Sequence, residues 1–264
     1  MLVEIFIHRN CSQCAVLLEF LKQRNLLHSV KLVDTELYPF VAIERGVLST
    51  PSVFVDGKLI FAGLVDLEQL EEILIKGEVP SASVELSELA DKLMRGVADS
   101  FALSSWLYVN LDFDALMAQR SFVEAVTGLA LDKEKEIKYS ALRNVMLKDG
   151  LIYFEKWKLD LVRNIGTNFV RELYWLYERK MERDEVRSLY PLAVFAHWVM
   201  VRGGAVGRVG LRIHPVSDSQ TFSRIKEVYD FVFSTWEQLW DKVISEQSRV
   251  KQLMHSLETR RMEV

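Results

Sequence analysis

Two cysteines, Cys11 and Cys14, are the only cysteines in the 264-residue chain, and they lie three positions apart. A β-rich apolar run over residues 3–7 precedes them, and apolar residues at helical spacing follow over residues 14–22. In an intracellular chain, this spacing at a strand-to-helix junction indicates a redox pair. Unpaired N–H groups in the first helical turn lower the pKa of a thiol placed there. The sequence therefore predicts Cys11 as the nucleophile and Cys14, one turn later and more shielded, as the resolving thiol.

The composition indicates a globular chain, because half of the residues are apolar and 27% are charged. A net charge of -4 provides no general attraction to nucleic acid or to an anionic membrane, so neither is expected as a partner. The strand pattern begins at residue 3, which predicts no signal peptide. The longest apolar stretch, residues 189–201, is too short to span a bilayer. We therefore expect a cytoplasmic protein without a framework of structural disulfides.

Residues 1–76 alternate strand and helix signals in the order β-α-β-α-β-β-α. The predicted strands cover residues 3–7, 30–33, 52–55 and 58–61, and the predicted helices cover residues 14–22, 40–45 and 66–75. The first two strands should be parallel, because a helix connects them. Asp56-Gly57 between two apolar runs predicts a tight hairpin, and Asp66 is the expected N-cap of the last helix.

Residues 77–84 break this pattern and predict a linker, after which residues 85–264 predict an all-helical domain. The expected helices cover residues 86–107, 113–126, 137–147, 152–165, 169–181 and 189–201, followed by one long amphipathic helix over residues 222–244. The chain is polar from Glu246 onward, with Leu253 and Leu257 suited to extend that last helix.

A second local signal is Thr50-Pro51, which stands directly before the third predicted strand. Proline at a strand entry marks an edge or a cis turn, because it cannot donate a hydrogen bond to a neighbouring strand. With the Cys-x-x-Cys pair, the element order and Phe61-Ala62-Gly63 before the last helix, residues 1–76 resemble the glutaredoxin and thioredoxin-like family. The resemblance implies an α/β thioredoxin-like fold of the glutaredoxin type. It also implies a cis Pro51 against the nucleophilic sulfur, with the backbone of Thr50 binding an extended substrate or glutathione.

Gly63 and Asp66 loosely match the family's Gly-Gly pair and the aspartate after it. The resemblance therefore implies a substrate-binding role for both residues. The chain also departs from the family, because Ser12-Gln13 replaces the usual dipeptide between the cysteines and Ala62 replaces the first glycine. The sequence therefore favours dithiol exchange over a reaction specific to glutathione. No resident cofactor is expected, while glutathione or another low-molecular-weight thiol is left open.

His8 stands three residues before Cys11, where glutaredoxins often carry a lysine. The sequence leaves two interpretations open, either a group that modulates the Cys11 pKa or an exposed histidine at a strand end. A structural zinc site needs about four ligands, and the chain has no second cysteine pair. No metal is therefore expected within one chain, whereas a metal or cluster shared between two chains is left open.

The layout of a small thioredoxin-like domain followed by helices loosely resembles that of glutathione transferases. Within the helical part, Arg202, Arg208 and Arg212 lie in a glycine-rich segment without a carboxylate, over residues 202–215. Arginines and glycine N–H groups suit an anion, so this segment is either a site for an anionic ligand or an acidic partner, or a flexible connection or short hairpin between helices. Helix-spaced tryptophans such as Trp157 and Trp240 are more often core residues than an aromatic ligand site.

These patterns favour a thiol–disulfide oxidoreductase that uses Cys11 and Cys14. Its helical domain would select or present a protein or small-molecule disulfide, and a reductase would supply electrons. One alternative is a glutathione-transferase-like enzyme that depends on a small thiol. Another is a redox-sensing protein whose helical domain binds a partner. A homodimer is left open.

Overall fold

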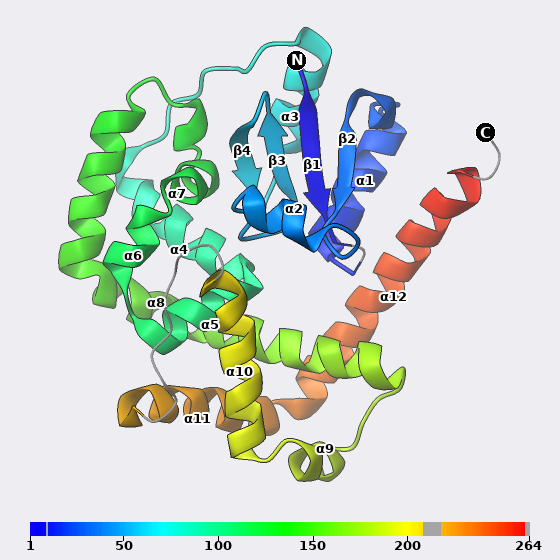
Figure 1. The fold of residues 1–264 in the computed structure, drawn as a ribbon, viewed down its shortest axis with the longest axis vertical. Coiled ribbons are helices and arrows are strands. Elements are labelled where there is room, and N and C mark those ends of the chain that lie inside the picture. Colours follow the sequence, from blue (N-terminus) through cyan, green and yellow to red (C-terminus); the bar gives the residue numbers. More distant parts are fainter. Residues whose placement is uncertain (9, 208–217, 262–264) are drawn as a thin grey trace.

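The structure, a computed structural model, describes the backbone of residues 1–8, 10–207 and 218–261. Side chains are described for residues 1–8, 10–201 and 218–253. The chain begins with a small mixed sheet and continues into a large assembly of helices (Figure 1). None of the described helices is long and apolar enough to cross a bilayer.

Four strands form one sheet in the order β2-β1-β3-β4. They are β1 (Val3–Ile7), β2 (Lys31–Asp34), β3 (Ser52–Val55) and β4 (Lys58–Ala62). Strands β1 and β2 are parallel, whereas β3 pairs antiparallel with both β1 and β4. At the hairpin, Asp56 and Gly57 have φ angles of 47° and 81°, as a two-residue turn between twisted strands requires. The predicted strands, the parallel pair and the hairpin are confirmed.

The two faces of the sheet pack against different parts of the chain. On one face, Val3, Ile5 and Ile7 share a core with α1 (Ser12–Gln23) and α3 (Leu67–Lys76). On the other face, Phe6 and Phe54 belong to the main core of the helical part. This division follows from the alternation of side chains along a strand. The sheet therefore packs on both faces, each face against a different apolar core.

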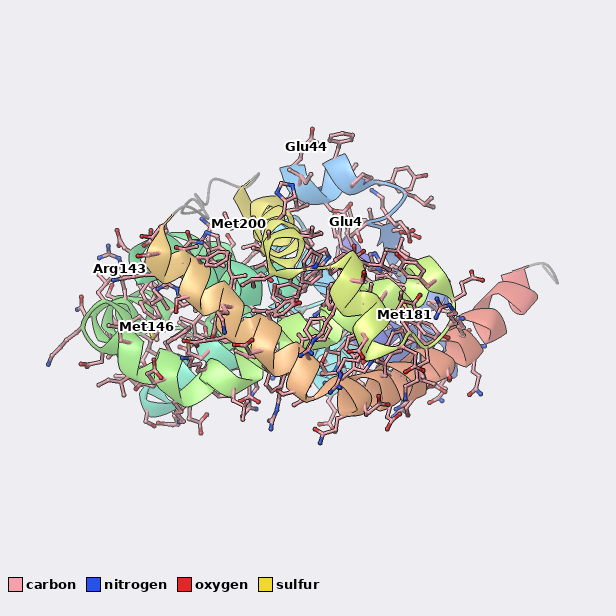
Figure 2. The ribbon with its side chains drawn as sticks, turned by 90° about the horizontal axis from the view of Figure 1, so that it is seen from below. Glu4, Glu44, Arg143, Met146, Met181 and Met200 are labelled. Carbon is pink, nitrogen blue, oxygen red and sulfur yellow. The ribbon has the colours of Figure 1, made fainter. Side chains whose placement is uncertain are left out.

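Two short elements complete this region, the 3₁₀ turn η1 (Leu27–Ser29) and the helix α2 (Pro39–Glu44). Gly46 follows α2 with a φ angle of 66°, so the predicted glycine ending is confirmed. Viewed from below, α2 projects from the edge of the molecule, with Glu44 near its tip (Figure 2). Asp66 caps α3 by accepting the N–H of Gln69 at 3.0 Å, as expected.

The described chain after α3 contains helices and no strand other than an isolated bridge between Ala82 and Asp132. The α-helices are α4 (Leu89–Asp99), α5 (Phe101–Asn110), α6 (Phe113–Ala118), α7 (Arg120–Thr127), α8 (Lys135–Tyr177), α9 (Arg183–Leu189), α10 (Leu192–Gly207), α11 (Ser219–Ser234) and α12 (Trp236–Arg261). Two 3₁₀ turns, η2 (Leu86–Glu88) and η3 (Leu129–Leu131), lie among them. The predicted all-helical character of this part is confirmed.

Helix α8 corrects the prediction of three helices over residues 137–181, because it is a single helix of 43 residues. At 1.5 Å per residue it is about 65 Å long, and Met146 marks its N-terminal part in Figure 2. The sequence pattern suggested breaks near Gly150 and Gly166. Both glycines are instead inside the helix. A Cβ atom on Gly150 would lie 2.7 Å from the Phe113 ring, and one on Gly166 would lie 3.1 Å from Val232. Glycine here permits close packing and does not end the helix.

Three other helix predictions were wrong in the opposite sense, because each of these expected helices is observed as two helices. Ser100 separates α4 from α5, where its side chain caps α5 and donates to the carbonyl of Leu48 at 2.7 Å. Gln119 separates α6 from α7, with its N–H bonded to the Leu116 carbonyl. Thr235 separates α11 from α12, and its hydroxyl donates to the Phe231 carbonyl at 2.8 Å. Side-chain bonds such as those of Ser100 and Thr235 compete with regular helix formation.

The region around α10 also differs from the prediction. Helix α9 was not expected, and α10 starts at Leu192, just after Pro191, instead of at residue 189. The first six residues of the glycine-rich segment, 202–207, continue α10, because extending a helix that has already formed is easy. The expected extension of the last helix beyond residue 244 is confirmed, since α12 reaches Arg261.

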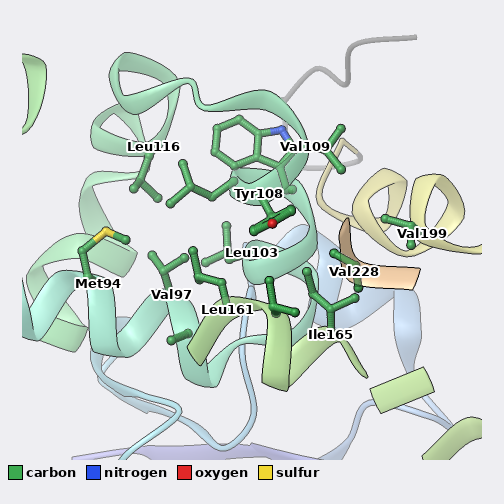
Figure 3. Packing of buried hydrophobic residues seen from close by; sticks show 14 of the residues in the cluster. Met94, Val97, Leu103, Tyr108, Val109, Leu116, Leu161, Ile165, Val199 and Val228 are labelled. Carbon is green, nitrogen blue, oxygen red and sulfur yellow. The ribbon is translucent and has the colours of Figure 1, made fainter. Parts of the chain in front are cut away.

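A large part of the main core lies where α4, α5, α8 and α11 meet (Figure 3). Leu103, Leu161, Ile165 and Val228 are fully buried there. Tyr108 is buried with them, and its hydroxyl donates to Glu227 at 2.8 Å. The buried tryptophans also belong to this core, in line with their expected structural role.

Candidate functional site

The cysteine pair lies at the carboxyl end of β1, where the chain turns into α1 (Figure 1). The N–H of Cys11 donates to the His8 carbonyl at 3.0 Å, which closes this turn. Cys11 is the N-cap residue of α1, and its sulfur accepts the N–H of Cys14 at 3.1 Å. Cys11 is half-buried and Cys14 is buried, and both are free thiols. The predicted placement of the pair at the first helical turn is confirmed.

The carbonyl of Thr50 lies beside the sulfur of Cys11. The peptide bond between Thr50 and Pro51 is cis, and the Cys11 thiol donates to the Thr50 carbonyl at 3.4 Å. The N–H of Gly63 donates to the Pro51 carbonyl at 2.8 Å. The sheet therefore brings Cys11, Thr50, Pro51 and Gly63 together from three separate segments.

The two thiols have opposite pKa shifts. The pKa of Cys11 is lowered, first by the hydrogen bond from the Cys14 side chain and then by the Cys14 N–H, Thr50 and the charge of Arg171, against an opposing effect of burial. The pKa of Cys14 is raised, first by burial and then by the bond and the charge of Cys11. The half-buried sulfur is therefore the easier of the two to ionise, as a nucleophile and resolving pair requires.

Helices α8 and α12 contact the segment that leads to Cys11. The rings of His8 and Trp175 stack with centroids 5.9 Å apart. Gln247 accepts the indole N–H of Trp175 at 3.0 Å and donates to the carbonyl of Asn10 at 3.2 Å. Gln247 is only 1% exposed, so these bonds are shielded from water. The described part of the site is thus built by the sheet region and the helical region together.

The imidazole of His8 has contacts on two sides. Its Nδ1 accepts the N–H of Asn10 at 3.2 Å, and its ring faces Trp175. In this arrangement a neutral His8 carries its proton on Nε2. The predicted role of His8 in tuning the Cys11 pKa stays a prediction.

An ion pair lies beside these contacts. Arg171 of α8 donates from one nitrogen, Nη2, to both carboxylate oxygens of Glu246 of α12, at 2.7 and 3.0 Å. Each side chain is 16% exposed. Asn168 accepts a further hydrogen bond from the Arg171 guanidinium. The positive charge of Arg171 is therefore held in a fixed place at the interface with the sheet region.

Among the described residues, no contact joins Asp66 to either cysteine sulfur. Its carboxylate caps α3, and it lines a cleft of about 480 Å³ between the β4–α3 loop and helices α4 and α7. Lys92 and Arg95 also line this cleft. The substrate-binding roles predicted for Gly63 and Asp66 stay predictions. Of the other expected site residues, the side chain of Arg202 and the whole of Arg208 and Arg212 lie outside the described residues.

The described residues offer little for a metal ion. In that part of the chain, no group of three or more His, Cys, Asp and Glu side chains is arranged to hold one. Two thiols alone do not complete the usual four-ligand site for zinc. The two free thiols, one helical turn apart, suit thiol redox chemistry in general.

Sequence reasoning missed Arg171, Trp175, Glu246 and Gln247 as neighbours of the cysteine pair. Gln247 lies 237 positions from Asn10 in sequence, and Arg171 lies 75 positions from Glu246. The four residues belong to no local motif. The only available signal was that Arg171 and Trp175 are four residues apart and so share one face of a helix.

Comparison with known proteins identifies the class of the first domain. A family model described as a thioredoxin domain matches residues 1–75. No curated protein and no solved structure matches the chain. The N-terminal domain is thioredoxin-like, followed by a mostly helical region, so the predicted family resemblance and fold class are confirmed. A thioredoxin-like domain supports a thiol-redox function in general.

Proposed function

We propose that the protein is a dithiol–disulfide oxidoreductase in which Cys11 is the nucleophile and Cys14 the resolving thiol. The observation that carries this proposal is the asymmetry of the pair. One sulfur is half-buried with a lowered pKa, whereas the other is buried with a raised pKa, and they lie one helical turn apart. The carbonyl of Thr50 beside Cys11 marks where an incoming chain would align.

In the first step, the Cys11 thiolate attacks one sulfur of a substrate disulfide. The substrate S–S bond breaks, a mixed disulfide forms, and the other substrate sulfur leaves as a thiolate. Cys11 then no longer carries a charge, which removes two of the causes that raise the Cys14 pKa. Cys14 can now give its proton to the departing thiolate and attack the sulfur of Cys11. The bond between Cys11 and the substrate breaks, and the second substrate sulfur leaves as a thiolate that takes a proton from water, replacing the one that Cys11 released on ionising. The products are a Cys11–Cys14 disulfide and two substrate thiols, so two electrons have passed to the substrate.

A complete cycle needs a reductant for the Cys11–Cys14 disulfide. A reductase or a low-molecular-weight thiol such as glutathione is proposed for this role, and a protein or small-molecule disulfide is proposed as the substrate. We also propose that residues 77–84 join two domains, 1–76 and 85–264. The helical domain would select the substrate, since α8 and α12 lie beside the cysteine pair.

Replacing Cys14 by serine should trap the mixed disulfide, because the thiol that releases the substrate is then missing. The reduced variant would be mixed with a peptide disulfide and examined by intact-mass spectrometry under non-reducing conditions. We expect an adduct with the mass of one peptide half at Cys11, reversed by dithiothreitol. The unchanged protein should show little adduct and instead lose the mass of two hydrogen atoms as its disulfide forms. A Cys14→Ser protein that forms no adduct would contradict the proposed roles.

A second candidate is an enzyme that uses a bound low-molecular-weight thiol, as in the transferase-like alternative. The cleft of about 480 Å³ beside the β4–α3 loop favours it, because Asp66, Lys92 and Arg95 offer both signs of charge there. Calorimetric titration with glutathione tests this candidate. Saturable binding that weakens in an Arg95→Met variant would support it, whereas the absence of binding would leave the dithiol reaction alone.

A further inference from the structure

The helical region presents one particular face to the cysteine loop. Arg171 and Trp175 are one turn apart on α8, so their side chains project from the same face. Trp175 stacks on His8, three residues before Cys11. This contact directs the face that bears Arg171 toward the end of β1, where the nucleophilic sulfur lies.

Helix α12 fixes both residues of that face. Glu246 holds the guanidinium of Arg171, and the next residue, Gln247, holds the indole of Trp175. Gln247 also donates to the carbonyl of Asn10, the residue directly before Cys11. Two adjacent residues of α12 thus connect the Arg171 charge to the backbone of the cysteine loop.

The environment of Arg171 is unusual for a structural ion pair. Its Nε atom is buried and has no hydrogen-bond partner among the described residues. A guanidinium in a fully satisfied structural role would normally use this donor as well. Its orientation is therefore fixed from one side by Glu246 and Asn168, while part of its donor capacity is unused.

We propose that Arg171 is a positioning residue for the reaction, the cation that the helical region supplies to the Cys11 thiolate, with Glu246 holding its guanidinium and Gln247 holding the neighbouring Trp175. This inference rests on the proposed function in taking Cys11 as the nucleophile. An arginine suits the role because its charge is permanent and its planar fork can be held rigidly. The charge of Arg171 also acts in the direction of a lowered Cys11 pKa, after the larger effects of the Cys14 hydrogen bond and N–H.

The inference gives the helical region a second task besides substrate selection. A thioredoxin-like domain without α8 would lack this cation, and its Cys11 would depend on the local hydrogen bonds alone. Attraction between a thiolate and a cation near it in a partly buried site is strong enough to change the fraction of ionised thiol severalfold. The nucleophile of residues 1–75 is thus tuned by a residue that lies beyond the family match.

The rate of Cys11 alkylation by iodoacetamide, measured from pH 4 to 9 on the full reduced chain, tests this inference. Peptide mapping would give the rate at Cys11 by itself. In Arg171→Met we expect a roughly threefold to tenfold slower reaction at pH 7 and a pH profile displaced upward. Arg171→Lys should recover most of the rate, because it keeps the charge. Arg163→Met is the matched control, since Arg163 is an exposed arginine two turns earlier on α8, and its profile should be unchanged.

Loss of Arg171 leaves Glu246 half-buried without its cation, which could prevent folding. The double variant Arg171→Met/Glu246→Gln removes both charges and should fold, with the slow reaction at Cys11 retained. A Cys11 pH profile in Arg171→Met or in this double variant equal to that of the unchanged protein would overturn the inference. The readout does not require disulfide turnover. A displaced profile in a protein that reduces no disulfide would therefore refute the proposed function alone.

Discussion

Replacement of Cys11 by serine is expected to abolish disulfide reduction, with a loss of roughly three orders of magnitude or more. The reason is chemical, because a serine hydroxyl stays protonated at neutral pH and cannot form a mixed disulfide. The fold should survive, since serine is a favoured N-cap residue and its oxygen can accept the Cys14 N–H that the sulfur accepts now. The assay is reduction of a model disulfide coupled to consumption of an external thiol or reductase.

Ser12→Ala is a suitable control for this experiment. It alters the residue next to Cys11 in the same turn but leaves both thiols in place, so activity should stay within a few-fold of the unchanged protein. Thermal unfolding of both variants would show that the fold is intact. Disulfide reduction by Cys11→Ser at the rate of Ser12→Ala would contradict the assignment of Cys11 as nucleophile.

Phe169→Ala should lower the free energy of unfolding by about 3–5 kcal/mol, the usual effect of truncating a buried aromatic residue. Phe169 is 1% exposed in the C-terminal part of α8. Its ring packs edge-on against Tyr190, Phe195 and Trp198, with centroid distances of 5.2, 5.0 and 5.0 Å. Truncation would remove these contacts together and leave a cavity between α8 and α10.

Urea denaturation followed by circular dichroism measures this effect. Ile152→Ala is the matched control, because Ile152 is an apolar residue of the same helix that is 67% exposed. Its effect should be within about 0.5 kcal/mol, as for most surface substitutions. Equal destabilisation by Phe169→Ala and Ile152→Ala would show that the aromatic cluster around Phe169 does not hold α10 against α8.

The features that sequence analysis predicted correctly have local causes. Asp56-Gly57 defines a hairpin because these residues tolerate positive φ angles. Cys11 and Asp66 cap helices through side chains that bond to N–H groups three residues away. The parallel pairing of β1 and β2 follows from the helix between them. Each of these signals is contained in a short stretch of chain, so the order and pairing of the thioredoxin-like elements could be predicted.

The features that were predicted wrongly depend on distant contacts. Gly150 lies inside α8 and does not end it. A glycine is needed there because the ring of Phe113 occupies the space that a side chain would fill. Ser100 interrupts a helical pattern partly because its hydroxyl donates to the carbonyl of Leu48, 52 positions away. For the same reason, the sequence did not show that Arg171 and Gln247 belong to the site. These residues reach the cysteine loop only after α8 and α12 have packed. Periodicity in sequence shows which face of a helix is apolar and does not show what the face will meet.

The reduction potential of the Cys11–Cys14 pair tests the central claim most directly. The native protein would be equilibrated in glutathione buffers of graded potential, trapped with acid, and scored by the mass of alkylated and disulfide forms. The proposed dithiol exchange predicts one reversible transition, with two electrons and a midpoint between about -300 and -120 mV, the range of known exchange proteins. A pair that forms no intramolecular disulfide in the most oxidising buffer, or forms one that glutathione cannot reopen, would contradict the proposal.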